Sequence, residues 1–177
     1  MPEKEEIICA FTGHRVAKLP WKNNEADSRC VMLKENLSEA IEELYGRGVR
    51  LFIGGMANGC DMYFAEAVLK LREACPDIRF EAAVPYPEQP NSWSTSEKER
   101  YRVILEKSDN VVTISRYYTR GCMMERNRYM VDRCNMLLAC YDGVSSGGTL
   151  NTLRYALKCG KELRQIDIPA FSQERFS

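Results

Sequence analysis

The sequence has little histidine, no net charge and no long apolar run. His14 is the only histidine, and the eight cysteines include no Cys-x-x-Cys pair, so a zinc site is poorly supported. The 25 Lys and Arg residues balance the 25 Asp and Glu residues, which leaves no basic surplus to indicate nucleic acid. No apolar run approaches the roughly 20 residues that a membrane-spanning helix needs. We therefore expect no bound metal, no membrane segment and no nucleic-acid partner.

The amino terminus lacks the features of an export signal. Such a signal is basic and then apolar over a long stretch, whereas residues 1–6 are mostly acidic and lead into a short apolar segment. The even number of cysteines is compatible with four disulfides. However, Cys9 and Cys140 lie inside apolar segments, as small core side chains do. We therefore expect a cytoplasmic protein with reduced thiols.

Short apolar segments alternate with longer segments of helical periodicity. This alternation predicts βαβ crossovers, and hence an α/β, Rossmann-like three-layer domain with a mostly parallel sheet and helices on both faces. Residues 1–177 form a single domain in this prediction, with a core over about residues 7–166 and a loose tail at 169–177. Strands are expected near residues 7–11, 50–54, 79–84, 110–114, 136–141 and 162–166, and helices near 25–47, 60–75, 95–107, 124–133 and 148–159.

Polar and glycine-rich segments follow the carboxyl ends of the predicted strands. In open parallel sheets these ends share one edge, where loops diverge and ligands bind. Four segments agree on this edge, which is the main functional indication in the sequence. They are residues 12–15, 54–61, 85–89 and 142–149.

The segment Ser145-Ser146-Gly147-Gly148-Thr149 leads directly into a predicted helix. Glycines let a backbone approach a phosphate closely, and the free N–H groups of a helix start favour an anion. The three hydroxyl groups add donors. The alternative is a helix N-cap with a tight turn. We expect these five residues to bind phosphate.

Gly54, Gly55 and Gly59 form a second strand–loop–helix segment, although their spacing is not that of a dinucleotide-binding fingerprint. Asp61 follows at the predicted helix start. Its carboxylate can accept a hydrogen bond from a ribose hydroxyl, or it can favour the first turn of the helix. Both interpretations of Asp61 stay open.

Two further segments offer ligand-binding side chains. Gly13, His14 and Arg15 follow the first strand, where Arg15 can make a bidentate contact with phosphate and His14 can hydrogen-bond a base, sugar or phosphate. The alternative is a loop with a surface ion pair and an ordinary histidine. Arg126 and Arg128 lie at a predicted helix start and offer further positive charge, although most helical arginines are simply solvated.

In their order along the chain, these segments resemble the YpsA-like (DUF1273) branch of the SLOG superfamily, which is related to the DprA/Smf and LOG domains. The resemblance implies a Rossmann-like domain that recognises nucleotides or nucleotide-derived signals and requires no further cofactor. It covers most of residues 7–166. The segments that carry it are 11–15, 54–61 with 65–68, 85–87 with Trp93, 126–132 and 141–149.

Some relatives in that superfamily are enzymes. LOG proteins release a base from a nucleoside monophosphate with a Gly-Gly-x-Gly-Thr-x-x-Glu loop, and Thr152 stands where the glutamate would be. A threonine supplies no carboxylate for this chemistry. The first hypothesis is therefore a nucleotide-binding sensor that passes its occupancy to a partner protein.

The second hypothesis is an N-glycosidic enzyme, a phosphoribohydrolase or transferase, that takes its carboxylate from another loop. Asp142 and Asp61 are the first candidates, and Glu66 and Glu88 are further ones. A DprA-like DNA-binding role fits the zero net charge poorly. The sequence leaves open the base, the number of phosphates, the partner and whether the chain forms a homo-oligomer.

Overall fold

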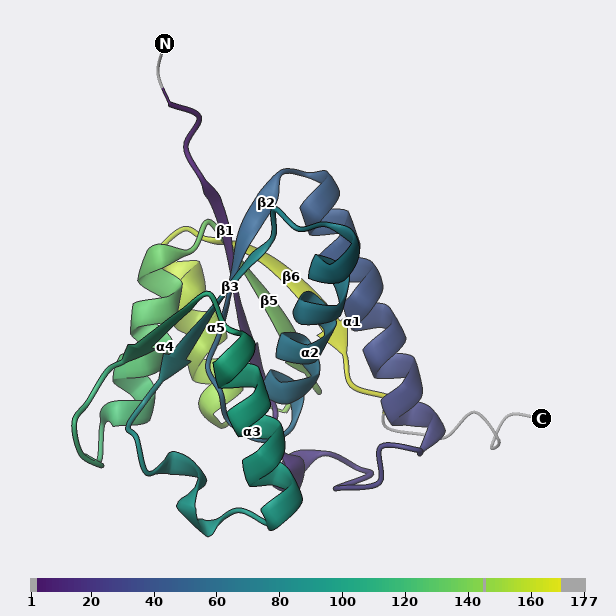
Figure 1. Ribbon diagram of the computed structural model, residues 1–177, viewed down its shortest axis with the longest axis vertical. Helices are drawn as coiled ribbons and strands as arrows, with labels where there is room; N and C mark the ends of the chain where they lie inside the picture. Colours follow the sequence, from purple (N-terminus) through teal and green to yellow (C-terminus); the bar gives the residue numbers. More distant parts are fainter. Residues whose placement is uncertain (1–2, 145, 170–177) are drawn as a thin grey trace.

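The computed structural model describes residues 3–144 and 146–169, within which six parallel strands form one sheet in the order β4-β3-β2-β1-β5-β6 (Figure 1). The strands are β1 Ile7–Gly13, β2 Val49–Gly54, β3 Arg79–Val84, β4 Asn110–Thr113, β5 Met136–Tyr141 and β6 Glu162–Asp167. The helices are α1 Ser28–Gly46, α2 Cys60–Ala74, α3 Thr95–Lys107, α4 Cys122–Arg133 and α5 Gly148–Lys158, with short 3-10 helices η1 Val16–Lys18 and η2 Gln89–Ser92.

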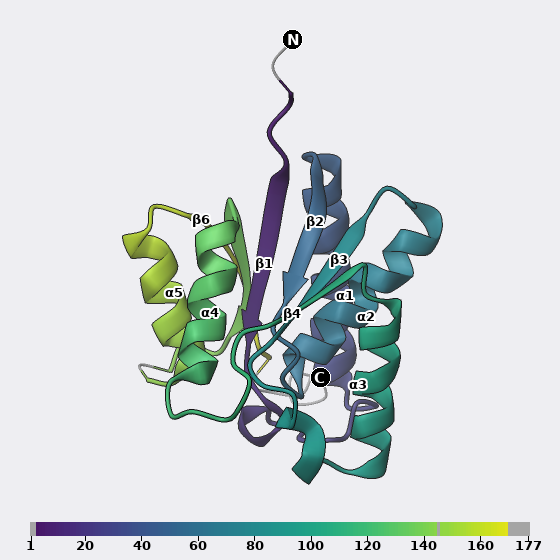
Figure 2. The same ribbon diagram turned by 60° about the vertical axis from the view of Figure 1, so that its left-hand side comes forward.

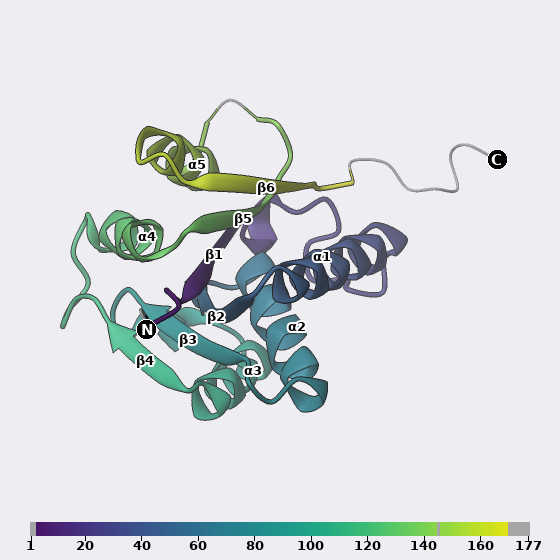
Figure 3. The ribbon, with the colours of Figure 1, turned by 90° about the horizontal axis from the view of Figure 1, so that it is seen from above.

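The strand order gives the sheet a switch point between β1 and β5. The chain adds β2, β3 and β4 outward on one side of β1, then returns through α4 to place β5 on the other side. Helices α1, α2 and α3 consequently cover one face and α4 and α5 cover the other (Figure 3). The expected parallel α/β sheet with helices on both faces is confirmed.

The core lies on both faces of the central strands, which are buried on each side and therefore read as continuous apolar runs. Phe11 of β1 stacks on Phe64 of α2, with ring centroids 4.5 Å apart, on the face that α1 and α2 cover. A second cluster, including Ile53, Leu137 and Leu153, packs beneath α4 and α5. This burial fixes the central strands, and the loops that follow them are positioned by it.

The predicted boundaries agree with the observed ones within a few residues. Helix α1 begins at Ser28, later than expected, because the Asp27 side chain accepts a hydrogen bond from the Arg29 backbone N–H at 2.9 Å and caps the helix. Thr12 and Gly13, which were expected in a loop, belong to β1 because they still pair with β5. The sequence did not predict η1 and η2.

All four loops identified from the sequence lie at the carboxyl edge of the sheet, as far as they are described. In Figure 2 the strands run downward, and the segments that follow β1, β2, β3 and β5 gather at the lower edge. The His14 ring contacts Thr149 across this edge, 135 positions away in the chain. Within residues 3–144 and 146–169, no helix has the length and apolar character needed to cross a membrane.

All eight cysteines are free thiols in the structure. Cys159 is exposed and Cys75 is half-buried, while the other six are buried. Burial also raises the pKa of the Cys9 thiol well above its ordinary value, so it forms thiolate poorly.

We expect a thiol titration of denatured protein, prepared without reductant, to find all eight cysteines reduced. In the folded protein the fastest reaction belongs to Cys159 because its thiol is the exposed one. Cys159→Ser removes that phase, and Cys75→Ser, the matched control, leaves it in place. Fewer than eight thiols in the denatured protein, or a fast phase that survives Cys159→Ser, contradicts this assignment.

Candidate functional site

A pocket of about 450 Å³ lies at the switch point. It is bounded by the end of β1 and the segment after it, by the starts of α2 and α5, and by one side of α4. Open parallel sheets bind ligands at this position because the loops on either side of the switch point diverge there. We call it the switch-point pocket.

His14 connects three parts of this pocket. Its ring is buried, with Nδ1 3.0 Å from Oγ1 of Thr149 and Nε2 2.9 Å from Oδ1 of Asp142. The Nε2 contact is close but is not a well-aligned hydrogen bond. Because a carboxylate only accepts, the network assigns the ring proton to Nε2 and leaves Nδ1 to accept the Thr149 hydroxyl. The ends of β1 and β5 and the start of α5 are thereby tied together.

The Asp142 carboxylate is held in its ionised form. Partial burial on its own raises the pKa, but contacts with His14 and with the Val144 backbone N–H outweigh it and lower the pKa below the ordinary value. The His14 ring is consequently next to a negative charge at neutral pH.

The backbone of residues 55–57, which follows β2, is fixed by three side chains. Arg126 donates to the Gly55 carbonyl, Gln89 donates to the Met56 carbonyl at 2.9 Å, and Asp61 accepts from the Ala57 N–H at 3.0 Å. Met56 has a φ of 62°, an unfavourable conformation for a non-glycine residue that persists only where the surroundings impose it. Such locally enforced strain is typical of functional sites.

Arg126 and Asp61 are both buried at the pocket wall. Burial lowers the pKa of Arg126 and raises that of Asp61, and the charge of each opposes the shift of the other. The two side chains make no direct ion pair. Arg126 therefore presents a positive charge that Asp61 compensates only at a distance, which favours an anionic ligand in the pocket.

Further positive charge surrounds the same pocket. Arg15, Lys18 and Arg120 are exposed side chains of its lining, and Asp61 is the one carboxylate among the lining residues. The Lys18 ammonium group lies against Gly147, where a Cβ atom would collide with it. Lys18 is thus placed at the start of α5, whose free backbone N–H groups also attract anions.

Glycines at this edge serve three different purposes. Gly148 faces open space, so the start of α5 is accessible to a ligand. Gly59 has a φ of 91°, and a Cβ there would lie 2.8 Å from the His14 carbonyl oxygen and from the Val16 nitrogen. Gly54 and Gly55 make room for Phe80 and Arg126 respectively. Gly54, the last residue of β2, and Gly55 therefore admit protein side chains and are not among the residues that line the pocket.

The structure brings together most of the residues selected from the sequence. Ser146, Gly147 and Asp142 are not among the lining residues, although Asp142 contacts His14 and Gly147 lies against Lys18, and Ser145 lies outside the described residues. Arg128 instead packs its guanidinium over the Tyr155 ring, 5.4 Å from the centroid. The predicted residues that do line the pocket are Gly13, His14, Arg15, Asp61, Arg126, Gly148 and Thr149.

Sequence reasoning missed the cations and apolar residues that complete the lining. Lys18 reaches the pocket because η1 turns the chain back after Arg15, and the periodicity of a three-residue helix is too short to detect. Arg120 precedes α4 by two residues, and Met123, Met124 and Met130 lie on the pocket side of α4. The only available signal was the spacing of three between Met123 and Arg126 and of four between Arg126 and Met130.

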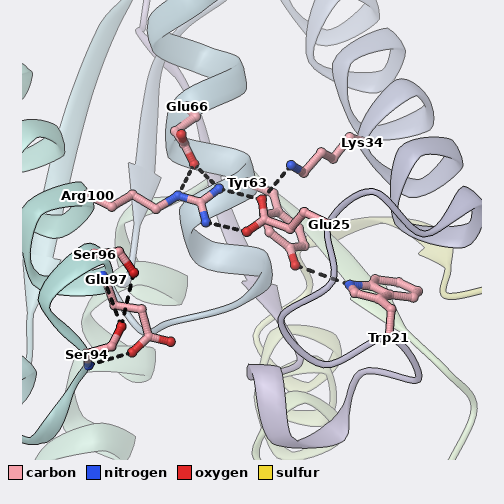
Figure 4. Close-up of polar contacts among 9 residues, drawn as sticks. All are labelled: Trp21, Glu25, Lys34, Tyr63, Glu66, Ser94, Ser96, Glu97 and Arg100. Carbon is pink, nitrogen blue, oxygen red and sulfur yellow. Dashed lines mark hydrogen bonds and ion pairs between the residues drawn. The ribbon is translucent and has the colours of Figure 1, made fainter.

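A larger pocket of about 600 Å³ lies beyond Gly59, between α2 and α3. Its lining carries Glu25, Glu66 and Glu97, and Arg100 is held there between Glu25 and Glu66 (Figure 4). Because its carboxylates outnumber its cation, this second pocket is unsuited to phosphate. Across the described part of the chain, no group of three or more His, Cys, Asp or Glu side chains is placed to hold a metal ion.

The parallel sheet and the cationic pocket at its switch point define a Rossmann-like α/β domain that is suited to an anionic ligand. The family model YpsA, described as the "YspA SLOG family", matches residues 9–170. The chain belongs to this family, and the expected YpsA-like SLOG membership is confirmed.

Two relatives illustrate the extent of the similarity. The "Uncharacterized SPbeta prophage-derived protein YoqJ" of Bacillus subtilis (strain 168) is 34% identical over 139 residues, which cover 71% of this chain and 81% of that protein. A "UPF0398 protein" of Bacillus thuringiensis (strain Al Hakam) is 25% identical over 165 residues, which cover 90% of this chain and 85% of that protein.

We expect Gly59→Ala to destabilise the protein by roughly 1–3 kcal/mol, because the new Cβ meets backbone atoms at a positive φ. Gly148→Ala is the matched control: its Cβ enters open space, and its stability should stay within about 0.5 kcal/mol of the parent. Urea unfolding measures both. Equal stability of the two variants would show that residues 14–16 do not pack against Gly59.

Proposed function

We propose that this protein binds a nucleotide or nucleotide derivative in the switch-point pocket and acts as a sensor domain. The observation that carries the proposal is the convergence of buried Arg126, exposed Arg15 and Lys18, and the open start of α5 on one pocket. Phosphate is the ligand group that this combination of guanidinium, ammonium and helix N–H groups favours.

The phosphate groups occupy the start of α5 in this proposal. Gly148 leaves space for close approach to the backbone, and Thr149 is the next residue of the helix. Lys18 and Arg15 are exposed cations of the pocket lining and Arg126 is a buried one, and together they would neutralise the phosphate charge. A bound phosphate would thereby supply the direct counter-charge that Arg126 lacks.

The remaining wall suits a nucleoside. Met123 and Met124 of α4 are half-buried and give one side of the pocket an apolar and adaptable surface against which a base can pack. Asp61 offers a carboxylate oxygen to a ribose hydroxyl, the role that the sequence left open. We assign the protein to the cytoplasm, without a required cofactor, and propose that it passes occupancy to a partner protein.

The N-glycosidic alternative finds less support. Thr152 is buried, and its hydroxyl donates to the Gly148 carbonyl at 2.9 Å within α5, so it offers the pocket neither a carboxylate nor a free hydroxyl. Asp61 and Asp142 are the carboxylates nearest to the proposed ligand. Asp142 is already engaged with His14, which leaves Asp61 as the main candidate for such an enzyme.

We expect a nucleotide from a panel of nucleoside mono-, di- and triphosphates, dinucleotides and ADP-ribose to raise the Tm of the wild-type protein. Arg15→Ala should weaken binding by about 1.5–3 kcal/mol because it removes a charge-assisted contact. Gly148→Val should block close approach of phosphate to α5. Thermal shift and isothermal titration calorimetry measure these changes.

The control for this experiment is Arg154→Ala. Arg154 is an exposed arginine farther along α5 and outside the pocket lining, so its removal costs the same formal charge without a ligand contact. Binding by Arg154→Ala should equal that of the wild type. If no phosphorylated compound stabilises the protein, or if Arg15→Ala and Gly148→Val bind as the control does, the proposed site is wrong.

We expect no release of base from nucleoside monophosphates at an enzyme-like rate. Glycosidic cleavage develops positive charge on the ribose, and position 152 has no carboxylate to stabilise it. Chromatography of a mixed nucleotide panel after long incubation makes the measurement, with Thr152→Glu as the variant that restores the carboxylate. Turnover by the wild type that disappears in Asp61→Asn or Asp142→Asn would establish the enzyme instead.

A further inference from the structure

The contacts of His14 have the order of a catalytic relay. A carboxylate (Asp142), an imidazole (His14) and a hydroxyl (Thr149) lie in sequence, with separations of 2.9 Å and 3.0 Å. The three residues come from the segments after β5 and β1 and from the first turn of α5. In this order the imidazole can accept the hydroxyl proton while the carboxylate stabilises the resulting imidazolium.

The hydroxyl of this relay is at the pocket wall. Thr149 is buried, yet it lines the switch-point pocket together with His14. Because the Thr149 hydrogen is directed to Nδ1 of His14, the lone pairs of Oγ1 remain for another partner.

A phosphate at the start of α5 would be adjacent to this oxygen. Gly148 and Thr149 are the first two residues of that helix, and Lys18 lies over the preceding Gly147. The helix N–H groups and the Lys18 ammonium group would stabilise the negative charge that gathers on the transferred phosphoryl group. The candidate nucleophile, its base and the anion site therefore lie next to one another at the start of α5.

We propose that Thr149 is a nucleophile that takes the terminal phosphoryl group from a nucleoside di- or triphosphate, with His14 as general base and Asp142 as a positioning residue. In the first step the Thr149 Oγ–P bond forms as the phosphoanhydride P–O bond breaks. The Thr149 proton moves to His14, and the nucleotide that is one phosphate shorter leaves with the electron pair. This proposal rests on the nucleotide site proposed above.

A second step returns the protein to its starting state. Water attacks phosphorus, the Thr149 Oγ–P bond breaks and inorganic phosphate leaves. The protonated His14 gives the proton that it took in the first step to the departing Thr149 oxygen, while one proton of the attacking water is lost to solvent and the other stays on the phosphate. The net reaction is hydrolysis of a phosphoanhydride, which is different chemistry from cleavage of a glycosidic bond.

The experiment incubates the full chain with nucleoside di- and triphosphates and magnesium. Rapid acid quench, intact-protein mass spectrometry and peptide mapping detect one phosphoryl group on Thr149, and a phosphate assay follows turnover. Thr149→Val should abolish both signals, while Thr149→Ser should restore them because it keeps the hydroxyl. Thr152→Val is the matched control, since it removes a buried threonine hydroxyl one turn later in the same helix.

The other two relay residues give separate readouts. His14→Asn should lower the rate of phosphate release by roughly 10²–10⁴-fold, the usual contribution of a general base. Asp142→Asn should lower kcat while KM stays near the wild-type value, whereas loss of a merely structural contact would weaken binding as well. Circular dichroism of each variant establishes that it is folded.

Thermal shifts recorded on the same samples separate the two proposals. If a nucleotide stabilises the wild type but yields neither phosphothreonine nor phosphate, the nucleophile is wrong and the binding site stands. If no nucleotide stabilises the protein and none is hydrolysed, both proposals fail. Phosphoryl transfer that is unchanged in Thr149→Val overturns the assignment to Thr149.

Discussion

The candidate site of this protein depends on a buried imidazole at the switch point, where the strand order reverses between β1 and β5. At a switch point the loops on either side diverge, so the neighbouring strands β1 and β5 lead into segments that nothing in the sheet keeps together. His14 joins them because one ring nitrogen meets Thr149 at the start of α5 and the other lies beside Asp142 after β5. The geometry of the pocket therefore depends on these two contacts of His14.

Charge is separated between the two neighbouring pockets, one cationic and one acidic. The backbone around residues 14–16 passes over Gly59, and this segment borders both pockets. On one side Arg126 is buried without a direct counter-ion, while on the other Arg100 is held between the carboxylates of Glu25 and Glu66 (Figure 4). A buried guanidinium without a direct counter-ion is costly, and this cost is the reason we propose phosphate as the ligand of the first pocket.

The fold was largely predictable because local apolar runs and helical periodicity in the sequence specify most of its strands and helices. The apolar runs of β1, β2 and β5 and the three-to-four spacing in α1 appear directly in the sequence, and their alternation implies a parallel sheet. Placement of the loops at one edge follows from that topology. The capping by Asp27 and the two 3-10 helices depend on contacts of single residues, which is why the boundaries differed there.

The location of the candidate site was predictable from the sequence, but the full set of residues that line it was not. Residues that follow a strand directly, such as His14 and Arg15, could be assigned to the pocket from position alone. Gly54 and Gly55 could not be interpreted, since only the packed structure shows that they admit Phe80 and Arg126. The His14–Thr149 contact joins residues 135 positions apart, and no pattern in a single sequence reveals such a pairing.

In the proposed site the start of α5 and Arg126 bind the same anion at the switch point. A crystal structure of the protein grown with a stabilising nucleotide is the decisive experiment. We expect phosphate oxygens within hydrogen-bond distance of the Gly148 or Thr149 backbone N–H and of the Arg126 guanidinium. Phosphate groups bound in the acidic pocket beside Arg100, or away from α5 altogether, would contradict it.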